Sequence, residues 1–168
     1  MTTITEPPGL IGLAIHAVRV PVAWVDYNGH MGDYAYGIVF SDAVTAYMDR
    51  IGVDAAYRGA SAATIYTLES RIGYLRECHE GAALTVDLLV LAADRKRIHT
   101  FMRLLNAEGA ELALCEQVLM HVSRASGTPR AALFPPEIQA RVDGDMAAHA
   151  ALPRPAWLSR PMGLARGA

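Results

Sequence analysis

The spacing of apolar residues along the chain predicts one strand, one long helix and then a run of further strands. Residues 13–24 alternate between apolar and other side chains as a strand does, and Pro21 indicates an edge or a bend. Over about residues 33–51 apolar side chains recur every three or four positions, the period of a helix with one buried face. Gly52 is expected to cap this helix.

Beyond Ala63 the period changes to the alternation of strands. The first of these strands is expected to place four side chains on one face: Tyr66, Leu68, Ile72 and Tyr74. A second strand follows Gly81, and residues 98–105 and 112–122 form a further pair. The sequence Asn-Ala-Glu-Gly at 106–109 is typical of the turn that joins such a pair.

A helix that precedes antiparallel strands must be wrapped by them, because helix and sheet each bury one apolar face. The sequence therefore predicts an α+β domain over residues 13–142, with a sheet curled around the central helix. Residues 1–12 are expected to form a loose lead-in, and Pro136 to begin a short helix that ends near Val142. Residues 143–168 read as a tail, from which Trp157 could dock on the domain.

Composition limits the function classes. The chain has 168 residues, of which 52% are apolar and 19% charged, so it suits one globular domain and not a disordered tail. A formal charge of −2 leaves no basic excess for nucleic acid or an anionic membrane. Low charge beside many apolar residues favours an oligomer. The apolar runs are too short to span a bilayer and no signal peptide is evident, so we expect a cytoplasmic protein.

Cysteine and histidine usage argues against metal or redox chemistry. Cys78 and Cys115 do not form a C-x-x-C pair and are expected to be buried, reduced thiols. The six histidines are scattered without metal-ligand spacing, so no metal is expected. His99 and His121 lie on predicted strands and are interpreted as structural. No G-x-S-x-G motif supports a serine hydrolase.

The segment richest in candidate catalytic side chains is residues 24–31, Trp-Val-Asp-Tyr-Asn-Gly-His-Met, directly before the predicted long helix. Asp26 could attack a carbonyl carbon or activate a water, while N–H groups near His30 to Gly32 could polarise the carbonyl oxygen. Gly29 would let a substrate approach the backbone. The alternative is that Asp26 and Asn28 only cap the helix, and spacing alone does not separate the two.

At these residues the chain resembles the hotdog-fold acyl-CoA thioesterases. The matching positions are Asp26, Gly29, His30, Met31 and Tyr36, and the resemblance extends over residues 20–136. Within that family, segments 24–31, 51–57 and 95–99 resemble the thioesterases of carnitine catabolism, which are stand-alone or fused to carnitine 3-dehydrogenase and hydrolyse betainyl-CoA to glycine betaine and CoA.

The resemblance implies a hotdog fold, no cofactor, and active sites between the subunits of a homodimer or dimer of dimers. By this resemblance, Asp26 is expected to be the nucleophile or the general base. Asn28 and His30 are expected to position the substrate and water, and Glu69 is a candidate for an additional acid. The chain has Gly32-Asp33 where many relatives have an Asn pair. We expect the charge of Asp33 to point away from the thioester, since it would oppose an oxyanion.

The resemblance also predicts how the substrate is held. A trimethylammonium group would need aromatic faces, and the candidates are Trp24, Tyr27, Tyr34, Tyr36, Tyr66 and Tyr74, with Gly29 and Met31 beside them. The basic turn Arg95-Lys96-Arg97 either binds the phosphates of CoA or is merely solvated. Two other functions stay open: a hydratase or dehydratase on the same fold, and a non-catalytic acyl-CoA-binding protein.

Overall fold

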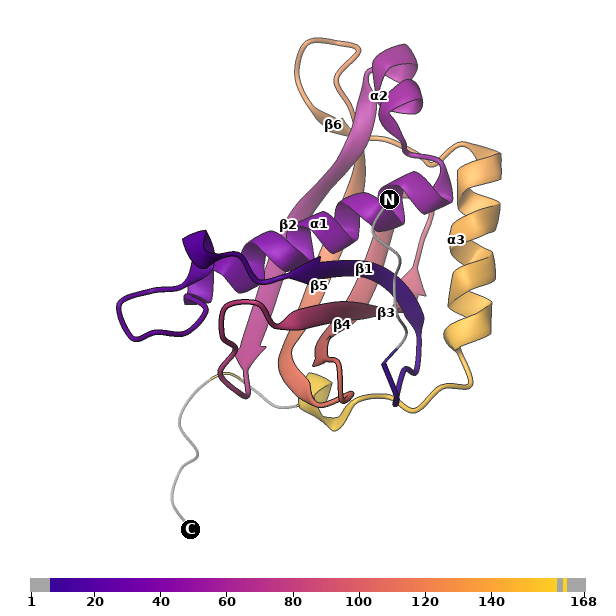
Figure 1. The fold of residues 1–168 in the computed structure, drawn as a ribbon. Helices are drawn as coiled ribbons and strands as arrows, with labels where there is room; N and C mark the ends of the chain where they lie inside the picture. Colours follow the sequence, from indigo (N-terminus) through magenta and orange to yellow (C-terminus); the bar gives the residue numbers. More distant parts are fainter. Residues whose placement is uncertain (1–6, 160–161, 163–168) are drawn as a thin grey trace.

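A computed structural model describes residues 7–159 and 162 (Figure 1). An antiparallel sheet has the strand order β1-β3-β4-β5-β2, with β6 added beside β5. The strands are β1 Leu13–Arg19, β2 Ala63–Tyr74, β3 Ala83–Ala93, β4 Arg97–Asn106, β5 Glu111–Ser123 and β6 Arg130–Ala131. The helices are α1 Asp33–Ile51, α2 Ala55–Ser61 and α3 Pro136–His149, with the 3-10 turns η1 Val22–Trp24 and η2 Ala156–Ser159.

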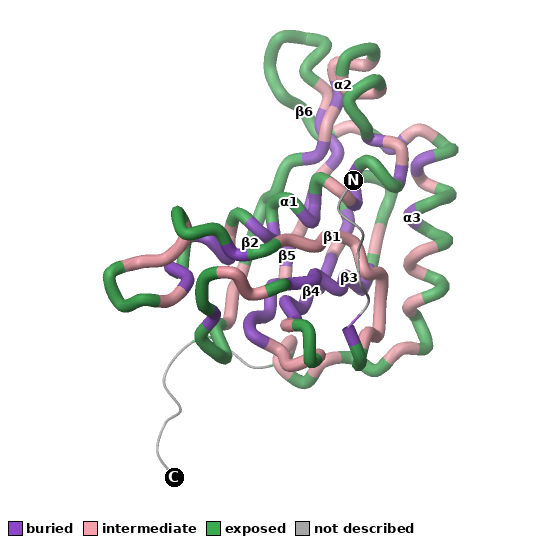
Figure 2. Tube along the Cα trace, in the orientation of Figure 1, coloured by how far each residue is buried: buried purple, intermediate pink, exposed green. Residues whose placement is uncertain are grey.

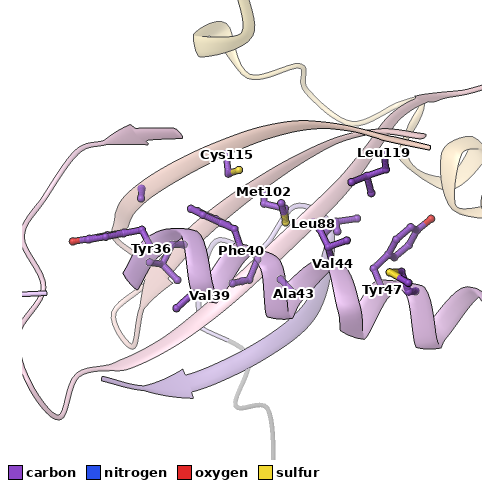
Figure 3. Packing of buried hydrophobic residues seen from close by; sticks show 14 of the residues in the cluster. Tyr36, Val39, Phe40, Ala43, Val44, Tyr47, Leu88, Met102, Cys115 and Leu119 are labelled. Atoms are coloured by element: carbon purple, nitrogen blue, oxygen red, sulfur yellow. The ribbon is translucent and has the colours of Figure 1, made fainter. Parts of the chain in front are cut away.

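Helix α1 lies across one face of the curled sheet, as the apolar spacing predicts (Figure 1). Its buried side chains, among them Val39, Phe40 and Tyr47, pack against Leu88 and Met102 of the sheet (Figure 3). Gly52 ends the helix with a φ of 95°, a left-handed conformation that favours glycine. The predicted α+β class and the limits of this helix are confirmed.

The strand order differs from a simple meander, because β2 pairs with β5 and lies at one edge of the sheet. Strands β3, β4 and β5 do follow one another, and the predicted turn at Asn106 joins the last two. The Asn106 side chain accepts hydrogen bonds from the N–H groups of Glu108 and Ala110 at 3.2 and 2.8 Å. Crossing from β2 to β3 therefore brings the end of β2 beside the start of α1 (Figure 1).

A β-bulge in β2 changes which side chains share a face. The pairing with β5 shifts between Thr67 and Glu69, so Leu68 is the extra residue. Before the bulge Ile65 is buried and Tyr66 is exposed; after it Ile72 packs on the core. The expectation that Tyr66 shares a face with Ile72 and Tyr74 is therefore wrong, because one extra residue reverses the alternation.

The C-terminal part is more structured than the sequence indicates. Helix α3 continues past Val142 to His149, whose Nδ1 accepts a hydrogen bond from the Val90 N–H at 2.9 Å. Trp157 then docks on the sheet, with its carbonyl oxygen 3.1 Å from Arg71 Nη2 and its ring under the Arg71 guanidinium at 3.8 Å. The chain beyond α3 thus covers an apolar patch on the face opposite α1, made of Leu89, Leu91, Phe101 and Leu114.

Several smaller features also differ from the sequence-based predictions. The first strand ends at Arg19, and Pro21, which lacks an N–H, precedes the 3-10 turn. Helix α2, whose N-cap Asp54 accepts from the Tyr57 N–H at 2.9 Å, was not predicted, nor was the short strand β6. Cys78 and Cys115 are free and buried, as expected. Strands β3 and β4 are buried along most of their length, whereas many of the loops at the ends of the sheet are exposed (Figure 2). No helix in the described part of the chain is long and apolar enough to cross a membrane.

Residues 9–12 are fastened to the sheet by a buried carboxylate, so this part of the lead-in is not loose. Asp87 accepts hydrogen bonds from the N–H groups of Ile11 and Gly12 at 3.0 and 2.8 Å. It also pairs with Arg103, which donates to the Gly9 carbonyl at 2.8 Å and to Glu111 at 3.1 Å. The whole side chain of Asp87 is buried.

Acid is expected to destabilise the fold through His121. This buried side chain contacts the Tyr57 hydroxyl through Nε2 at 2.8 Å and the Ala132 carbonyl through Nδ1 at 3.2 Å. Desolvation by burial lowers the pKa of His121 below its ordinary value. The unfolded chain then binds a proton that the folded chain does not, so the free energy of unfolding falls as pH drops below about 6.5.

Thermal unfolding from pH 8 to pH 5 measures this effect. We expect the melting temperature to hold above about pH 6.5 and to decline below it, with a shallower decline in His121→Gln. The exposed His79 supplies the matched control: His79→Gln is expected to follow the wild-type profile. Identical profiles for His121→Gln and the wild type would contradict the assignment.

Candidate active site

A pocket of about 670 Å³ lies at the N-terminal end of α1. Its walls come from the loop before α1, from the first turn of the helix and from the segment that follows β2. The lining residues are Asp26, Tyr27, His30, Met31, Gly32, Asp33, Tyr34, Tyr36, Tyr74, Leu75, Arg76 and Glu77. Three carboxylates and one guanidinium are among them, which makes the pocket acidic.

A tight turn holds Asp26 at the pocket wall. The Asp26 N–H donates to the His30 carbonyl at 2.9 Å, and the Gly29 N–H donates to the Asp26 carbonyl at 3.0 Å. Gly29 has a φ of 83°, which a residue with a side chain rarely adopts. The tight turn between Asp26 and His30 thus depends on glycine at this position.

Asn28 orients the Asp26 carboxylate. Its N–H donates to Oδ1 at 2.8 Å, and its side-chain Nδ2 donates to Oδ2 at 3.4 Å. Both oxygens are therefore directed by the turn while the half-buried carboxylate still faces the pocket. Asn28 itself does not line the pocket, so its role would be to position Asp26.

His30 lines the pocket and lies 3.7 Å from the Glu77 carboxylate, measured from Nε2 to Oε1. The neighbouring Gly29 carbonyl contacts His79 Nδ1 at 3.2 Å. Both contacts tie the loop before α1 to the segment after β2, which fixes the two walls relative to each other.

Two of the N–H groups expected to bind the oxyanion already donate hydrogen bonds within the protein. The Met31 N–H donates to the Cys78 carbonyl at 2.7 Å, and the Gly32 N–H donates to the Trp24 carbonyl at 2.9 Å. Within the described residues, the N–H groups of His30 and Asp33 have no acceptor. The expectation for His30 to Gly32 is therefore corrected: His30 stays a candidate donor and Asp33, at the start of α1, is added.

Asp33 is exposed, but it does not lie clear of the site, contrary to the expectation from the sequence. It lines the pocket, and its Oδ1 accepts a hydrogen bond from the Tyr34 N–H at 2.7 Å. A carboxylate is favourable at a helix N-terminus, which accounts for its stability there. Its negative charge therefore borders the same pocket as Asp26.

Tyrosines form much of the apolar surface of the pocket. Tyr36 is buried and lies edge-on to Tyr74, with ring centroids 5.2 Å apart and an angle of 86° between the rings. Burial raises the pKa of the Tyr36 hydroxyl to about 12. Tyr34 donates from its hydroxyl to the Ala23 carbonyl at 2.9 Å, whereas Tyr27 is 96% exposed and projects from the rim.

Other predicted site residues lie outside this pocket. Trp24 packs on the core, and Tyr66 lies before the bulge of β2, away from Tyr74. Glu69, also on β2, lines a separate hollow with Arg71 and Glu116. Within one chain, none of these three residues lines the pocket that contains Asp26.

The basic turn Arg95-Lys96-Arg97 lies beside β6 and α2, near the other end of α1. The Lys96 carbonyl accepts from the His121 N–H at 2.8 Å, and His121 contacts Tyr57 of α2. Asp94 binds the Arg97 guanidinium at 2.7 and 2.9 Å, and these hydrogen bonds lower the pKa of the Asp94 carboxyl. Helix α1 has 19 residues and is roughly 28 Å long, so the basic turn and Asp26 lie far apart in one chain. Phosphate binding by this turn stays a prediction.

The sequence patterns do not predict Leu75, Arg76 and Glu77 as site residues. They follow β2 directly and reach the pocket because β2 lies at the edge of the sheet opposite β1. The Tyr36 hydroxyl donates to the Arg76 carbonyl at 3.3 Å, which fastens this segment to α1. Hydrophobic periodicity carries no signal for a contact of this kind.

Comparison with known proteins agrees with this geometry. Residues 20–142 match the family model of the thioesterase-like superfamily. The chain is 46% identical to a betainyl-CoA thioesterase of Pseudomonas aeruginosa over 153 residues, covering 90% of this chain and 95% of that protein. It is 38% identical over 131 residues to an L-carnitine dehydrogenase/betainyl-CoA thioesterase of Agrobacterium fabrum, covering 78% of this chain and 26% of that longer protein.

A solved structure also supports the fold. A Staphylococcus aureus protein determined in complex with CoA superposes with a TM-score of 0.82 at 26% identity, covering 97% of this chain and 100% of that one. Together with the curled sheet around α1 and the matching family model, this likeness establishes the hotdog fold. The chain belongs to the thioesterase-like superfamily.

Proposed function

We propose that this protein hydrolyses betainyl-CoA to glycine betaine and CoA. The observation that carries the proposal is Asp26, oriented by Asn28 in an acidic, tyrosine-lined pocket at the start of α1. The identity to a betainyl-CoA thioesterase over 90% of the chain supports the substrate. A thioester is already activated, so the reaction requires no cofactor.

The geometry supports two routes with the same products. In the first, an Asp26 oxygen attacks the thioester carbon, the C–S bond breaks, the thiolate takes a proton, and water hydrolyses the resulting anhydride. In the second, Asp26 accepts a proton from a water that attacks the same carbon. In either route the carbonyl oxygen would become anionic beside the N–H groups of His30 and Asp33.

The charge of the acyl group supplies the test of this function. Betainyl-CoA and its neutral isostere 3,3-dimethylbutyryl-CoA have the same shape, but only the first carries a positive charge. We expect kcat/KM for betainyl-CoA to be higher by about tenfold or more, because the pocket holds three carboxylates and exposed aromatic rings. Release of free thiol measures both rates, and equal rates would contradict the proposal.

A second copy of the chain is expected to pair along β2. This edge strand has 12 residues, and among residues 7–159 no strand pairs with its outer edge. Exposed apolar side chains, among them Tyr66, Leu68 and Leu75, lie on or just after it. Sedimentation analysis should give at least twice the 18.1 kDa mass of one chain, and a monomer at micromolar concentration would contradict this pairing.

A further inference from the structure

The pocket contains a carboxylate that thioester hydrolysis does not need. Asp33 lies at the start of α1, where its charge opposes the formation of an oxyanion on a neutral acyl group. We propose that Asp33, with the rings of Tyr34 and Tyr74, forms a subsite for the quaternary ammonium group of the acyl chain. This inference rests on the proposed function and assigns its acyl specificity to three residues.

Asp33 has a hydrogen bond to each of the two tyrosines. Its Oδ1 accepts from the Tyr34 N–H at 2.7 Å, and its backbone carbonyl accepts from the Tyr74 hydroxyl at 3.4 Å. Tyr34 and Tyr74 are 54% and 53% exposed and line the same pocket as Asp33, so part of each side chain is open to a ligand there. Tyr36 packs edge-on against Tyr74 and limits the movement of that ring.

The subsite lies close enough to Asp26 for a short acyl group. A Cβ atom added to Gly32 would lie 2.8 Å from Cε1 of Tyr34 and 3.6 Å from Cβ of Asp26, so both side chains border the same small space. In betaine the nitrogen and the carbonyl carbon are separated by one methylene, about 2.5 Å. A cation seated at Tyr34 and Asp33 would therefore present its carbonyl to Asp26.

The chemistry of these residues matches a cation without hydrogen-bond donors. A trimethylammonium group is attracted by aromatic faces and by a nearby carboxylate, and it needs no hydrogen-bond acceptor. Its positive charge also offsets the repulsion between Asp33 and a developing oxyanion. Asp33 therefore favours the transition state of a cationic acyl group and disfavours that of a neutral one.

The test compares kcat/KM for betainyl-CoA with kcat/KM for 3,3-dimethylbutyryl-CoA in four proteins. These are the wild type, Asp33→Asn, Tyr74→Leu and Tyr74→Phe. We expect the preference for the cation to fall by about 5- to 30-fold in Asp33→Asn and Tyr74→Leu, because each removes one attraction to the cation. Tyr74→Phe keeps the ring and should keep the preference.

The outcomes separate the subsite from the function on which it rests. If the wild type prefers betainyl-CoA and Asp33→Asn and Tyr74→Leu retain that preference, the subsite is wrong and the function stands. If both substrates lose activity equally in these two variants, the residues are structural and the subsite is again wrong. If the wild type hydrolyses other thioesters but not betainyl-CoA, the proposed function fails and the subsite fails with it.

Discussion

Replacing Asp26 by Asn should lower kcat for betainyl-CoA by about 10²- to 10⁴-fold, because an amide neither attacks a thioester nor accepts a proton from water. The substitution keeps the size of the side chain, and Asn28 can still donate to the remaining carbonyl oxygen. Binding of the substrate is therefore expected to survive. Free-thiol release measures hydrolysis, and calorimetric titration with a non-hydrolysable thioether analogue measures binding.

The control for this variant is Asp42→Asn. Asp42 is an exposed carboxylate on α1 outside the pocket, so the same chemical change there should leave hydrolysis unaltered. If Asp26→Asn hydrolyses betainyl-CoA at the wild-type rate, Asp26 is neither nucleophile nor base. Loss of binding together with hydrolysis would instead make Asp26 a substrate-binding residue.

Replacing Asp87 by Ala should destabilise the fold by about 3–5 kcal/mol, the effect of leaving one member of a buried ion pair alone. The variant leaves Arg103 buried without its main partner and removes the acceptor for the N–H groups of Ile11 and Gly12. The melting temperature should fall by about 10 °C, given 2–4 °C per kcal/mol for a chain of this size. Thermal unfolding followed by circular dichroism measures the shift.

Two comparisons isolate the buried charge. Glu111→Ala removes the more exposed partner of Arg103 and should cost less than about 1 kcal/mol. The double variant Asp87→Leu/Arg103→Met leaves no uncompensated charge and should be more stable than Asp87→Ala. A double variant that is less stable than Asp87→Ala would show that the hydrogen bonds of Arg103 to Gly9 and Glu111 stabilise the fold more than its unpaired buried charge destabilises it.

The sequence predicts the parts of this fold that depend on local patterns. The period of residues 33–51 locates α1, and the Asn106 turn and Gly52 cap follow from short-range geometry. The segment around Asp26 could also be located, because a carboxylate, an amide and an imidazole precede a helix start. Resemblance to thioesterases then favoured catalysis over capping for this segment.

What the sequence did not predict depends on contacts between distant segments. The strand order brings Leu75, Arg76 and Glu77 to the pocket. The Met31 N–H donates to the carbonyl of Cys78, which is distant in sequence, and so is not available to a substrate. Tyr74 lines the same pocket as Asp33 and donates to the Asp33 carbonyl, a contact that forms only in the folded chain. Alternation alone gave no sign of the extra residue at Leu68.

That extra residue determines which change of length β2 can absorb. Deleting Leu68 would remove the bulge and restore an uninterrupted two-residue repeat, while every later residue keeps its present partner on β5. Tyr74 would therefore stay beside Asp33. Natural variants can be expected to change length at the loop of residues 106–109 and, within β2, to lack the bulge residue.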